Sequence, residues 1–428
     1  MSKTTYRPLE FLLSLVTTRT SASKNQTWPY IGLEHMPSGG TSIAAFGSAE
    51  ESISTNGIFY PGDVLFGKLR PRLRKTLRAD RPGYCSTDVL VLRPNEAVDP
   101  VFASYVAQSE TVFSAAIRTE EGTKMPRCSW RDLRGVKVFC PDDRRLQKKI
   151  ALILGSTDIT IEKTEALIAK YQQIKVGLMH DLFTRGVLPN GKLRSPSSEA
   201  PELYKETALG WIPKEWNVSG LAAMGRPGIS WIRTGPFGSA LKGEHWRTHG
   251  HPVITIGALG EGVFTQEDLL FVDARDAARL TDFQLKHGDV VFSRVADVGR
   301  SAVVRKNQIG WIMSSNLMRI AVDEMRARPD FLQMALAGDA RIKSQIRARV
   351  NSGGRDVANS EVLNQLRFVW PDIAEQDRII ELSSRVSRNL EIEQQRAEKL
   401  RQQKLGLMQD LLTGKLPVKT DEPEATHA

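Results

Sequence analysis

The sequence predicts a mixed α/β (α+β) protein that is built twice, as two globular units that are each followed by one long helix. The two expected helices end in nearly the same sequence, Gly-Leu-Met-His-Asp-Leu-Phe-Thr at 177–184 and Gly-Leu-Met-Gln-Asp-Leu-Leu-Thr at 406–413. The two sequences are 406 − 177 = 229 residues apart. Their expected starts, Gln147 and Gln376, keep the offset, since 376 − 147 = 229. A register that holds over a whole helix indicates two copies of one structural unit.

Each expected helix carries a narrow apolar seam, with Lys, Arg, Glu and Gln on its other faces. The seam positions follow one another after seven, four or three residues and are equivalent in the two copies. They are Ile150, Thr157, Ile161, Ile168, Tyr171, Leu178 and Leu182 in the first helix, and Ile379, Val386, Leu390, Ala397, Leu400, Leu407 and Leu411 in the second. This spacing predicts a coiled coil. One copy alone would also fit an ordinary long core helix.

Glycines recur at matching places in both helices. Gly177 and Gly406 lie inside the helices, where glycine costs about 1 kcal/mol relative to alanine. Their recurrence predicts a close approach of the two backbones, although plain duplication would also explain it. Gly186 and Gly414 follow the last turns, where a C-terminal cap favours a residue with positive φ.

Residues 1–140 are expected to form the first globular unit, with short strands between glycine and proline turns and a helical stretch over 100–117. Its most basic segment, 68–75, has cations at alternating positions, Lys68, Arg70, Arg72 and Arg74. An extended chain would place all four on one face, and such a face suits regularly spaced phosphates. Pro71 limits the segment to an edge strand or a loop. The alternative is a charged edge strand that prevents aggregation.

The rest of the chain divides by the same signals into a first helix (141–186), a linker (187–208), a second globular unit (209–370), a second helix (371–415) and a tail expected to be disordered (416–428). In the second unit, Gly-Asp-Val-Val-Phe at 288–292 echoes Gly-Asp-Val-Leu-Phe at 62–66, and cations follow both phrases. Outside the segment 68–75, the candidate cations for binding phosphates are Lys124, Lys242, Arg294, Arg300, Arg305 and Arg355.

Composition narrows the partners and the compartment. The net charge of +10 and the pI of about 9.5 favour a polyanionic partner. Three cysteines without a Cys-x-x-Cys pair fit a reducing cytoplasm and no metal knuckle. No apolar run approaches a membrane span. His245, His249 and His251, with Glu244, form the only histidine cluster, and it lacks the cysteine or aspartate partners of a common metal site.

The motifs of catalysis are missing from the sequence. No glycine-rich cofactor loop follows a strand, and no Asn-Pro-Pro-aromatic methyl-transfer motif is present. We therefore expect no catalytic residues and no cofactor on this chain. Trp231, Phe237 and Trp246 fit core packing or base stacking better than a cofactor site.

Four sequence motifs resemble those of a known protein family. They are Tyr-Lys-Glu-Thr-Ala-Leu-Gly-Trp-Ile-Pro-Lys-Glu-Trp at 204–216, Thr-Gly-Pro-Phe-Gly-Ser-Ala-Leu-Lys at 234–242, Tyr-Ile-Gly-Leu-Glu-His at 30–35, and Pro-Gly-Asp-Val-Leu-Phe at 61–66. With the two helix endings, these phrases resemble the specificity subunit of a type I restriction–modification system. The resemblance covers nearly the whole chain.

The resemblance implies a non-catalytic subunit that serves defence against phage. Two target-recognition domains would each read half of a bipartite DNA site, and two antiparallel helices would hold them apart. Two methyltransferase subunits and two motor-nuclease restriction subunits would join the complex, and S-adenosylmethionine, ATP and Mg²⁺ would belong to them. The alternatives are a basic coiled-coil scaffold that binds DNA outside restriction–modification, and a fused restriction or methylation enzyme.

The helix ends are the expected docking surface for the methyltransferase subunits. They are apolar around more than one face, and surplus apolar surface commonly marks an interface. The candidates are Leu178, Met179, Leu182, Leu407, Met408, Leu411 and Leu412. The alternative is that these side chains are buried within the protein.

Overall fold

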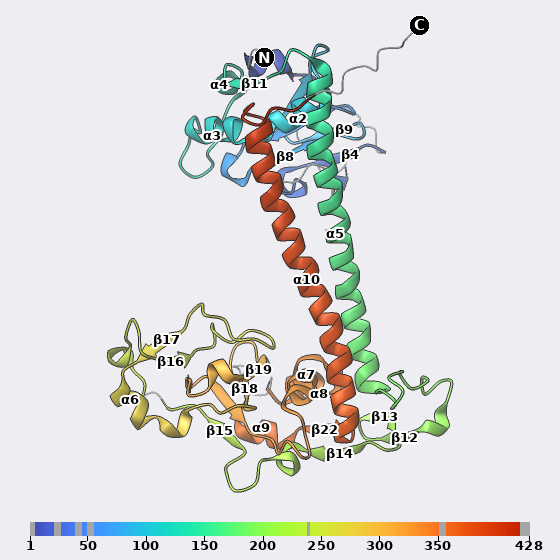
Figure 1. Ribbon diagram of the computed structural model, residues 1–428, viewed down its shortest axis with the longest axis vertical. Helices are drawn as coiled ribbons and strands as arrows, with labels where there is room; N and C mark the ends of the chain where they lie inside the picture. The colour runs from blue at the N-terminus through green and yellow to red at the C-terminus, as the bar shows by residue number, and fades with distance from the viewer. Residues whose placement is uncertain are drawn as a thin grey trace. The chain divides into compact units, whose positions relative to one another are not determined.

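The computed structural model describes residues 5–20, 27–38, 45–48, 55–237, 240–350 and 357–419. The chain forms two compact units, unit 1 from residues 1–168 and 393–428 and unit 2 from residues 169–392. Each unit therefore contains part of both long helices, α5 (Arg144–Thr184) and α10 (Ile373–Leu411), which are green and red in Figure 1. The two helix starts keep the predicted offset, since 373 − 144 = 229, and each lies three residues before the expected start.

Unit 1 has one two-stranded, one four-stranded and one five-stranded sheet among its described residues. The first pairs β1 (Tyr6–Pro8) with β11 (Lys137–Phe139). The second has the order β2 (Leu13–Val16), β10 (Val89–Pro94), β7 (Val64–Gly67), β8 (Thr76–Arg78). The third has the order β3 (Arg19–Thr20), β6 (Asn56–Phe59), β9 (Gly83–Cys85), β4 (Pro29–Ile31), β5 (Gly47–Ser48), with β4 and β9 parallel. Its shorter helices are α1 (Leu9–Leu12), α2 (Pro100–Ala107), α3 (Glu110–Arg118) and α4 (Trp130–Leu133).

Unit 2 repeats most of this arrangement and adds a hairpin at its start, β12 (Tyr204–Thr207) with β13 (Gly210–Pro213). Strand β14 (Asn217–Gly220) pairs with β22 (Arg367–Trp370). The four-stranded sheet has the order β15 (Ile232–Thr234), β21 (Leu317–Ile320), β18 (Val290–Ser293), β19 (Ser301–Val303). The three-stranded sheet has the order β17 (Leu270–Val272), β16 (His251–Ile254), β20 (Ile312–Met313), with β16 and β20 parallel. Its helices are α6 (Ala274–Arg279), α7 (Pro329–Gly338), α8 (Ala340–Val350) and α9 (Ser360–Gln365).

A buried glutamine joins the long helix to the globular part in both units. Gln147 accepts a hydrogen bond from the backbone N–H of Asp99 (2.7 Å) and donates one to the carbonyl of Pro141 (2.7 Å). Gln376, 229 residues later, accepts from the backbone N–H of Arg328 (2.8 Å) and donates to the carbonyl of Pro371 (3.0 Å). Two buried amides with equivalent partners show that the duplication extends to the polar interior.

In each unit, α5 and α10 run antiparallel. Asp158 pairs with Lys404 and Glu165 with Arg401 in unit 1, so later residues of α5 meet earlier residues of α10. In unit 2, Ser383 of α10 donates a hydrogen bond to the sulfur of Met179. All fourteen seam side chains that the sequence predicts are buried or half-buried. The prediction of two long helices in contact is confirmed.

Two expectations about glycines have different outcomes. Gly186 and Gly414 have φ values of 66° and 72°, so both close the helices as left-handed caps, as expected. Gly177 and Gly406 do not mark a close approach, because a Cβ added at either position meets no atom within 4 Å. The prediction of a backbone crossing at these two residues was wrong.

The structure describes part of the tail that was expected to be disordered. Residues 420–428 of the expected disordered tail lie outside the described residues, but Val418 packs against the core of unit 1. No helix within the described ranges is long and apolar enough to cross a membrane.

Candidate nucleic-acid interface

The basic segment 68–75 of unit 1 is not an extended strand. Arg70 and Arg74 have φ values of 51° and 50°, and they flank a short 3-10 helix, η3 (Pro71–Leu73). The backbone N–H of Arg70 donates to the carbonyl of Pro126 at 2.7 Å, which holds this turn in place. The prediction that alternation puts four cations on one face was therefore wrong, because a turn breaks the two-residue period of a strand.

Carboxylates divide the cations of this segment into two groups. Arg72 pairs with Glu120 at 2.8 Å and Arg74 with Glu110 at 2.7 Å. The hydrogen bond with Glu110 raises the pKa of Arg74, and it lowers the pKa of the Glu110 carboxyl. Among the described residues, no carboxylate pairs with Lys68, Arg70 or Lys124. Free cations attract phosphate more strongly than neutralised ones, so Lys68, Arg70 and Lys124 are the stronger candidates.

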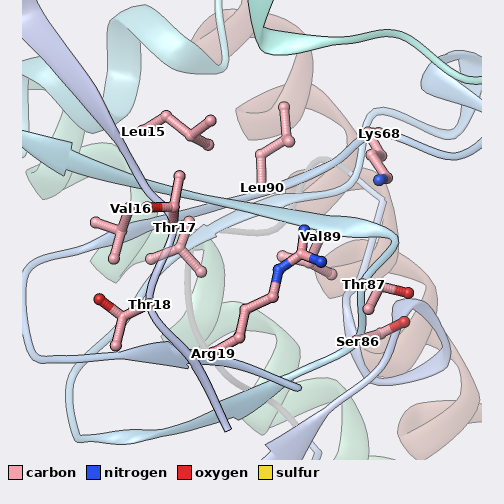
Figure 2. Close-up of a pocket in the computed structure, with 12 residues that line it drawn as sticks. Leu15, Val16, Thr17, Thr18, Arg19, Lys68, Ser86, Thr87, Val89 and Leu90 are labelled. Atoms are coloured by element: carbon pink, nitrogen blue, oxygen red, sulfur yellow. The ribbon is translucent and has the colours of Figure 1, made fainter. Parts of the chain in front are cut away.

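A groove lies beside Lys68 in unit 1. One wall is the stretch 15–19, which leaves the four-stranded sheet at the end of β2 and enters the five-stranded sheet at β3. The other wall is the stretch 86–91, which crosses between the same two sheets from β9 to β10. Figure 2 shows the Arg19 side chain reaching toward the side of the groove where Thr87 and Lys68 lie. Arg19 was missed by the sequence analysis, because an isolated arginine carries no local pattern.

Most candidate cations of unit 2 form hydrogen bonds or ion pairs within the protein. Arg294 donates to the carbonyls of Ala358 (3.3 Å) and Ser315 (3.4 Å), and Arg300 donates to the carbonyl of Ile256 (3.3 Å). Arg305 forms a bidentate ion pair with Asp330. Lys242 is exposed, and Arg355 lies outside the described residues.

The aromatic and histidine candidates of unit 2 separate by burial. Trp231 and Trp246 pack against hydrophobic cores, whereas Phe237 is 74% exposed and is therefore open to stacking. His245 hydrogen-bonds Asp276 at 3.0 Å. The hydrogen bond from Arg279 and the weaker effect of the bond with His245 both lower the pKa of the Asp276 carboxyl. Within the described ranges, no group of histidine, cysteine and acidic side chains is arranged to hold a metal ion.

The predicted docking residues at the helix ends are mostly internal. Leu182 belongs to the core of unit 2, and Leu411 and Leu412 belong to the core of unit 1, all nearly fully buried. The half-buried Leu178 and Met179 pack against the core of unit 2, and Leu407 and Met408 pack against the core of unit 1. Leu182, Leu411 and Leu412 leave no surplus apolar surface, because the globular part of each unit covers them. The alternative of internal burial is correct for Leu182, Leu411 and Leu412.

Other apolar side chains of the helices face solvent. Val176 in unit 2 is 73% exposed and Leu405 in unit 1 is 58% exposed, and they are equivalent positions, since 405 − 176 = 229. Leu152 (72% exposed) and Ile159 add to the exposed apolar surface of unit 1, and Ile174 adds to that of unit 2. The sequence held a signal for them, because Val176 and Leu405 are both apolar at one repeat position outside the seam.

Comparison with known families and sequences identifies similar proteins. Residues 233–402 match the model of the type I restriction modification DNA specificity domain. The chain is 23% identical to the MjaVIII specificity subunit of Methanocaldococcus jannaschii, with 78% of this chain and 74% of the relative covered. It is 22% identical to the putative MjaX specificity subunit of the same organism, with 97% and 94% covered.

Two solved structures share the fold along nearly the whole chain. One, from a study of assembly and conformational transition in a type I restriction–modification system, has a TM-score of 0.59 at 16% identity, with 96% of this chain and 98% of the other covered. The other is the specificity subunit of M. genitalium, with a TM-score of 0.57 at 14% identity and 97% and 96% covered.

Proposed function

Because the chain belongs to the specificity subunits of type I restriction–modification systems, we propose that its two units read one half each of a bipartite DNA site. The chain is the DNA specificity subunit of such a system, a non-catalytic component. The observation that carries the two-half proposal is the duplicated frame, with equivalent sheets, equivalent buried glutamines and an offset of 229 between the helix starts. Within this frame the surface cations differ, as two readers of different half-sites require.

The candidate contacts in unit 1 are Lys68, Arg70 and Lys124, with Arg72 and Arg74 available where DNA displaces their carboxylates. In unit 2 they are Lys242, Arg294, Arg300, Arg305 and Arg355. The excess positive charge of +10 supports a polyanionic ligand. DNA binding should therefore weaken steeply as the salt concentration rises.

We assign two further roles to the helices. α5 has 41 residues, about 60 Å of helix at 1.5 Å per residue, and its length together with that of α10 would set the gap between the half-sites. The exposed apolar side chains Val176 and Leu405, with Leu152 and Ile159, would dock the methyltransferase subunits. This surface replaces the buried helix ends as the proposed interface, because only exposed apolar groups can be covered by a partner.

The partners supply the chemistry. Two methyltransferase subunits and two restriction subunits would assemble with this chain, and S-adenosylmethionine, ATP and Mg²⁺ would bind to them. The relatives are specificity subunits, and this supports placing the cofactors on the other subunits.

A unit exchange tests the proposed reading. Residues 209–370 are replaced by the equivalent unit of another type I specificity subunit, and methylated adenines are mapped in the host genome by single-molecule sequencing. We expect one half of the methylated site to change and the other half to stay. A change in both halves would contradict independent reading, and a protein that binds every duplex alike would favour the general scaffold.

A second experiment tests the docking surface. Val176→Asp and Leu405→Asp together should prevent assembly with the methyltransferase subunits, because they place charge on a surface that must be desolvated. The matched control is Gln172→Asp with Gln403→Asp, which introduces the same charges at exposed polar positions of the same helices. Size-exclusion chromatography of the mixed subunits gives the readout, and normal assembly of the first variant would place the interface elsewhere.

A further inference from the structure

In the groove of unit 1, backbone hydrogen bonds hold the segment that carries the cation Lys68. The backbone N–H of Lys68 donates to the carbonyl of Asp88 (2.9 Å), and its carbonyl accepts from the N–H of Cys128 (3.1 Å). These bonds fix the root of the side chain at the groove while the ammonium group stays free. Arg19 stands on the opposite wall, where it begins β3 and pairs with Gly57 of β6.

The positive charge of the groove is not cancelled by the carboxylate beside it. Asp88 is the acidic residue of the stretch 86–91, and it is held by Arg127, with Nε and Oδ1 2.9 Å apart. No ion pair of the described residues engages Arg19 or Lys68. The groove therefore presents two uncompensated cations with an adjacent hydroxyl donor, Thr87.

The lining also includes the apolar side chains of Val16, Val89 and Val91, beside the hydroxyl groups of Thr17 and Ser86. Two cations and a hydroxyl suit the oxygens of a phosphate group, which accept charge-assisted hydrogen bonds. The apolar side chains suit the sugar that a phosphate carries in nucleic acid. A small free anion would leave these side chains uncovered.

Unit 2 lacks the same arrangement. Lys68 corresponds to Arg294, since 294 − 68 = 226 as for the Gly-Asp-Val phrases, and Arg294 is bound to backbone carbonyls. Strand pairing relates Leu15 of β2 to Ile232 of β15, because their partners Leu92 and Ile320 both pair with the valine of that phrase. Four residues further on, Arg19 is matched by Pro236.

We propose that the groove of unit 1 holds one phosphodiester of the DNA backbone between Arg19 and Lys68, and so fixes where this unit sits along its half-site. The inference rests on the proposed function and adds a contact that unit 2 does not repeat. Phosphate contacts set the register of a protein on DNA, and the base contacts then read the sequence in that register.

The test is a phosphate-by-phosphate scan with the full chain assembled with its partner subunits. Single phosphates of a target duplex are replaced by neutral methylphosphonates, and binding is measured over a range of salt concentrations. The wild-type protein should lose affinity, roughly tenfold, at one position in one half-site. Arg19→Ala with Lys68→Ala should weaken binding to the unmodified duplex, lower the salt slope by about two, and abolish the penalty at that position alone.

Arg72→Ala is the matched control, because Arg72 is a more exposed arginine of the same unit that is already paired with Glu120. It should leave the position-specific penalty intact. A double variant that keeps this penalty overturns the inference. So does loss of inorganic phosphate binding in the variant without any change on DNA, since it would make the groove a site for small anions. If wild-type protein does not distinguish its target from an unrelated duplex, the proposed function fails instead.

Discussion

The two units share one frame and differ in the charged groups buried within it. In unit 2, Glu375 is 3% exposed and accepts hydrogen bonds from Arg194, from the indole of Trp216 and from the backbone of Val187. This cluster ties the linker to the start of α10. The equivalent position in unit 1 is Leu146, since 375 − 229 = 146.

Unit 1 has its own buried polar cluster, where Lys404 pairs with Asp158 at 2.6 Å and the hydroxyl of Tyr105 donates to the same carboxylate at 2.6 Å. Unit 2 has Ser387 at the position of Asp158, since 158 + 229 = 387. The glutamines are thus common to the frame, whereas each ion cluster belongs to one unit. A substitution at a cluster should therefore have no counterpart in the other unit, whereas equivalent substitutions at the two glutamines should each cost their own unit a similar free energy.

The largest effect is expected from Glu375→Ala. It removes the main carboxylate partner of the buried Arg194 guanidinium, which keeps only the carbonyl of Arg185 (2.9 Å) and the more distant Glu215 (3.8 Å). Breaking a buried pair costs about 3–5 kcal/mol. Hydrogen exchange of the full chain should show faster exchange in unit 2 with little change in unit 1. Arg194→Met combined with Glu375→Leu removes both charges and should recover much of the loss. Equal destabilisation of the two units would contradict their independence.

The glutamine substitutions should have smaller and matched effects. Gln147→Leu removes the partner of one backbone N–H and one carbonyl, at about 1–3 kcal/mol for each unsatisfied group. Gln376→Leu removes the partner of one N–H and of the carbonyls of Pro371 and Arg326. Chemical denaturation of the two single variants should give similar losses, the first in unit 1 and the second in unit 2. A large loss from only one of them would show that the common frame has diverged.

Alkaline pH should affect unit 1 more than unit 2. All three cysteines lie in unit 1, where burial raises the pKa of Cys85 to about 12 and the pKa values of Cys128 and Cys140 to about 11. Because these folded-state pKa values exceed that of an unfolded thiol, about 8.5, the thiols stabilise the fold below pH 8.5 and this contribution is lost as the pH rises. The loss is on the order of 1 kcal/mol per thiol by pH 10.

Thermal melting from pH 7 to pH 10, followed by hydrogen exchange, measures this difference. Cys128→Ala should flatten the pH dependence of unit 1 even where it lowers the stability at pH 7. An unchanged slope would mean that the buried thiols do not control the alkaline transition.

The smallest effect should come from the helix glycines, and it should be stabilising. Gly406→Ala in unit 1 and Gly177→Ala in unit 2 add a methyl group into open space. Each should gain up to about 1 kcal/mol from helix propensity, measured by denaturation. A loss of stability at either position would instead support the close approach of the two helix backbones that the structure contradicts.

Patterns that repeat along the chain were readable from the sequence, and contacts between distant residues were not. The helices, their offset and their seam follow from spacing alone. The turn at Arg70 depends on the carbonyl of Pro126, and the neutralisation of Arg72 depends on Glu120, so no local pattern contains either. Leu411 and Leu412 look like surplus apolar surface until residues of the first globular part cover them. Arg19 and Lys68 line the same groove only because two sheets meet there, and the sequence does not show how these sheets are arranged.

The division of the chain has a consequence for synthesis. Unit 2 is continuous, residues 169–392, whereas unit 1 joins residues 1–168 to residues 393–428. Leu411 and Leu412 fill the core of unit 1, so this core cannot close until the ribosome has made residues that come after the whole of unit 2. Domains commonly fold in the order in which they are made. Here the part that emerges first must wait, with its apolar surface uncovered, for the last helix to be released.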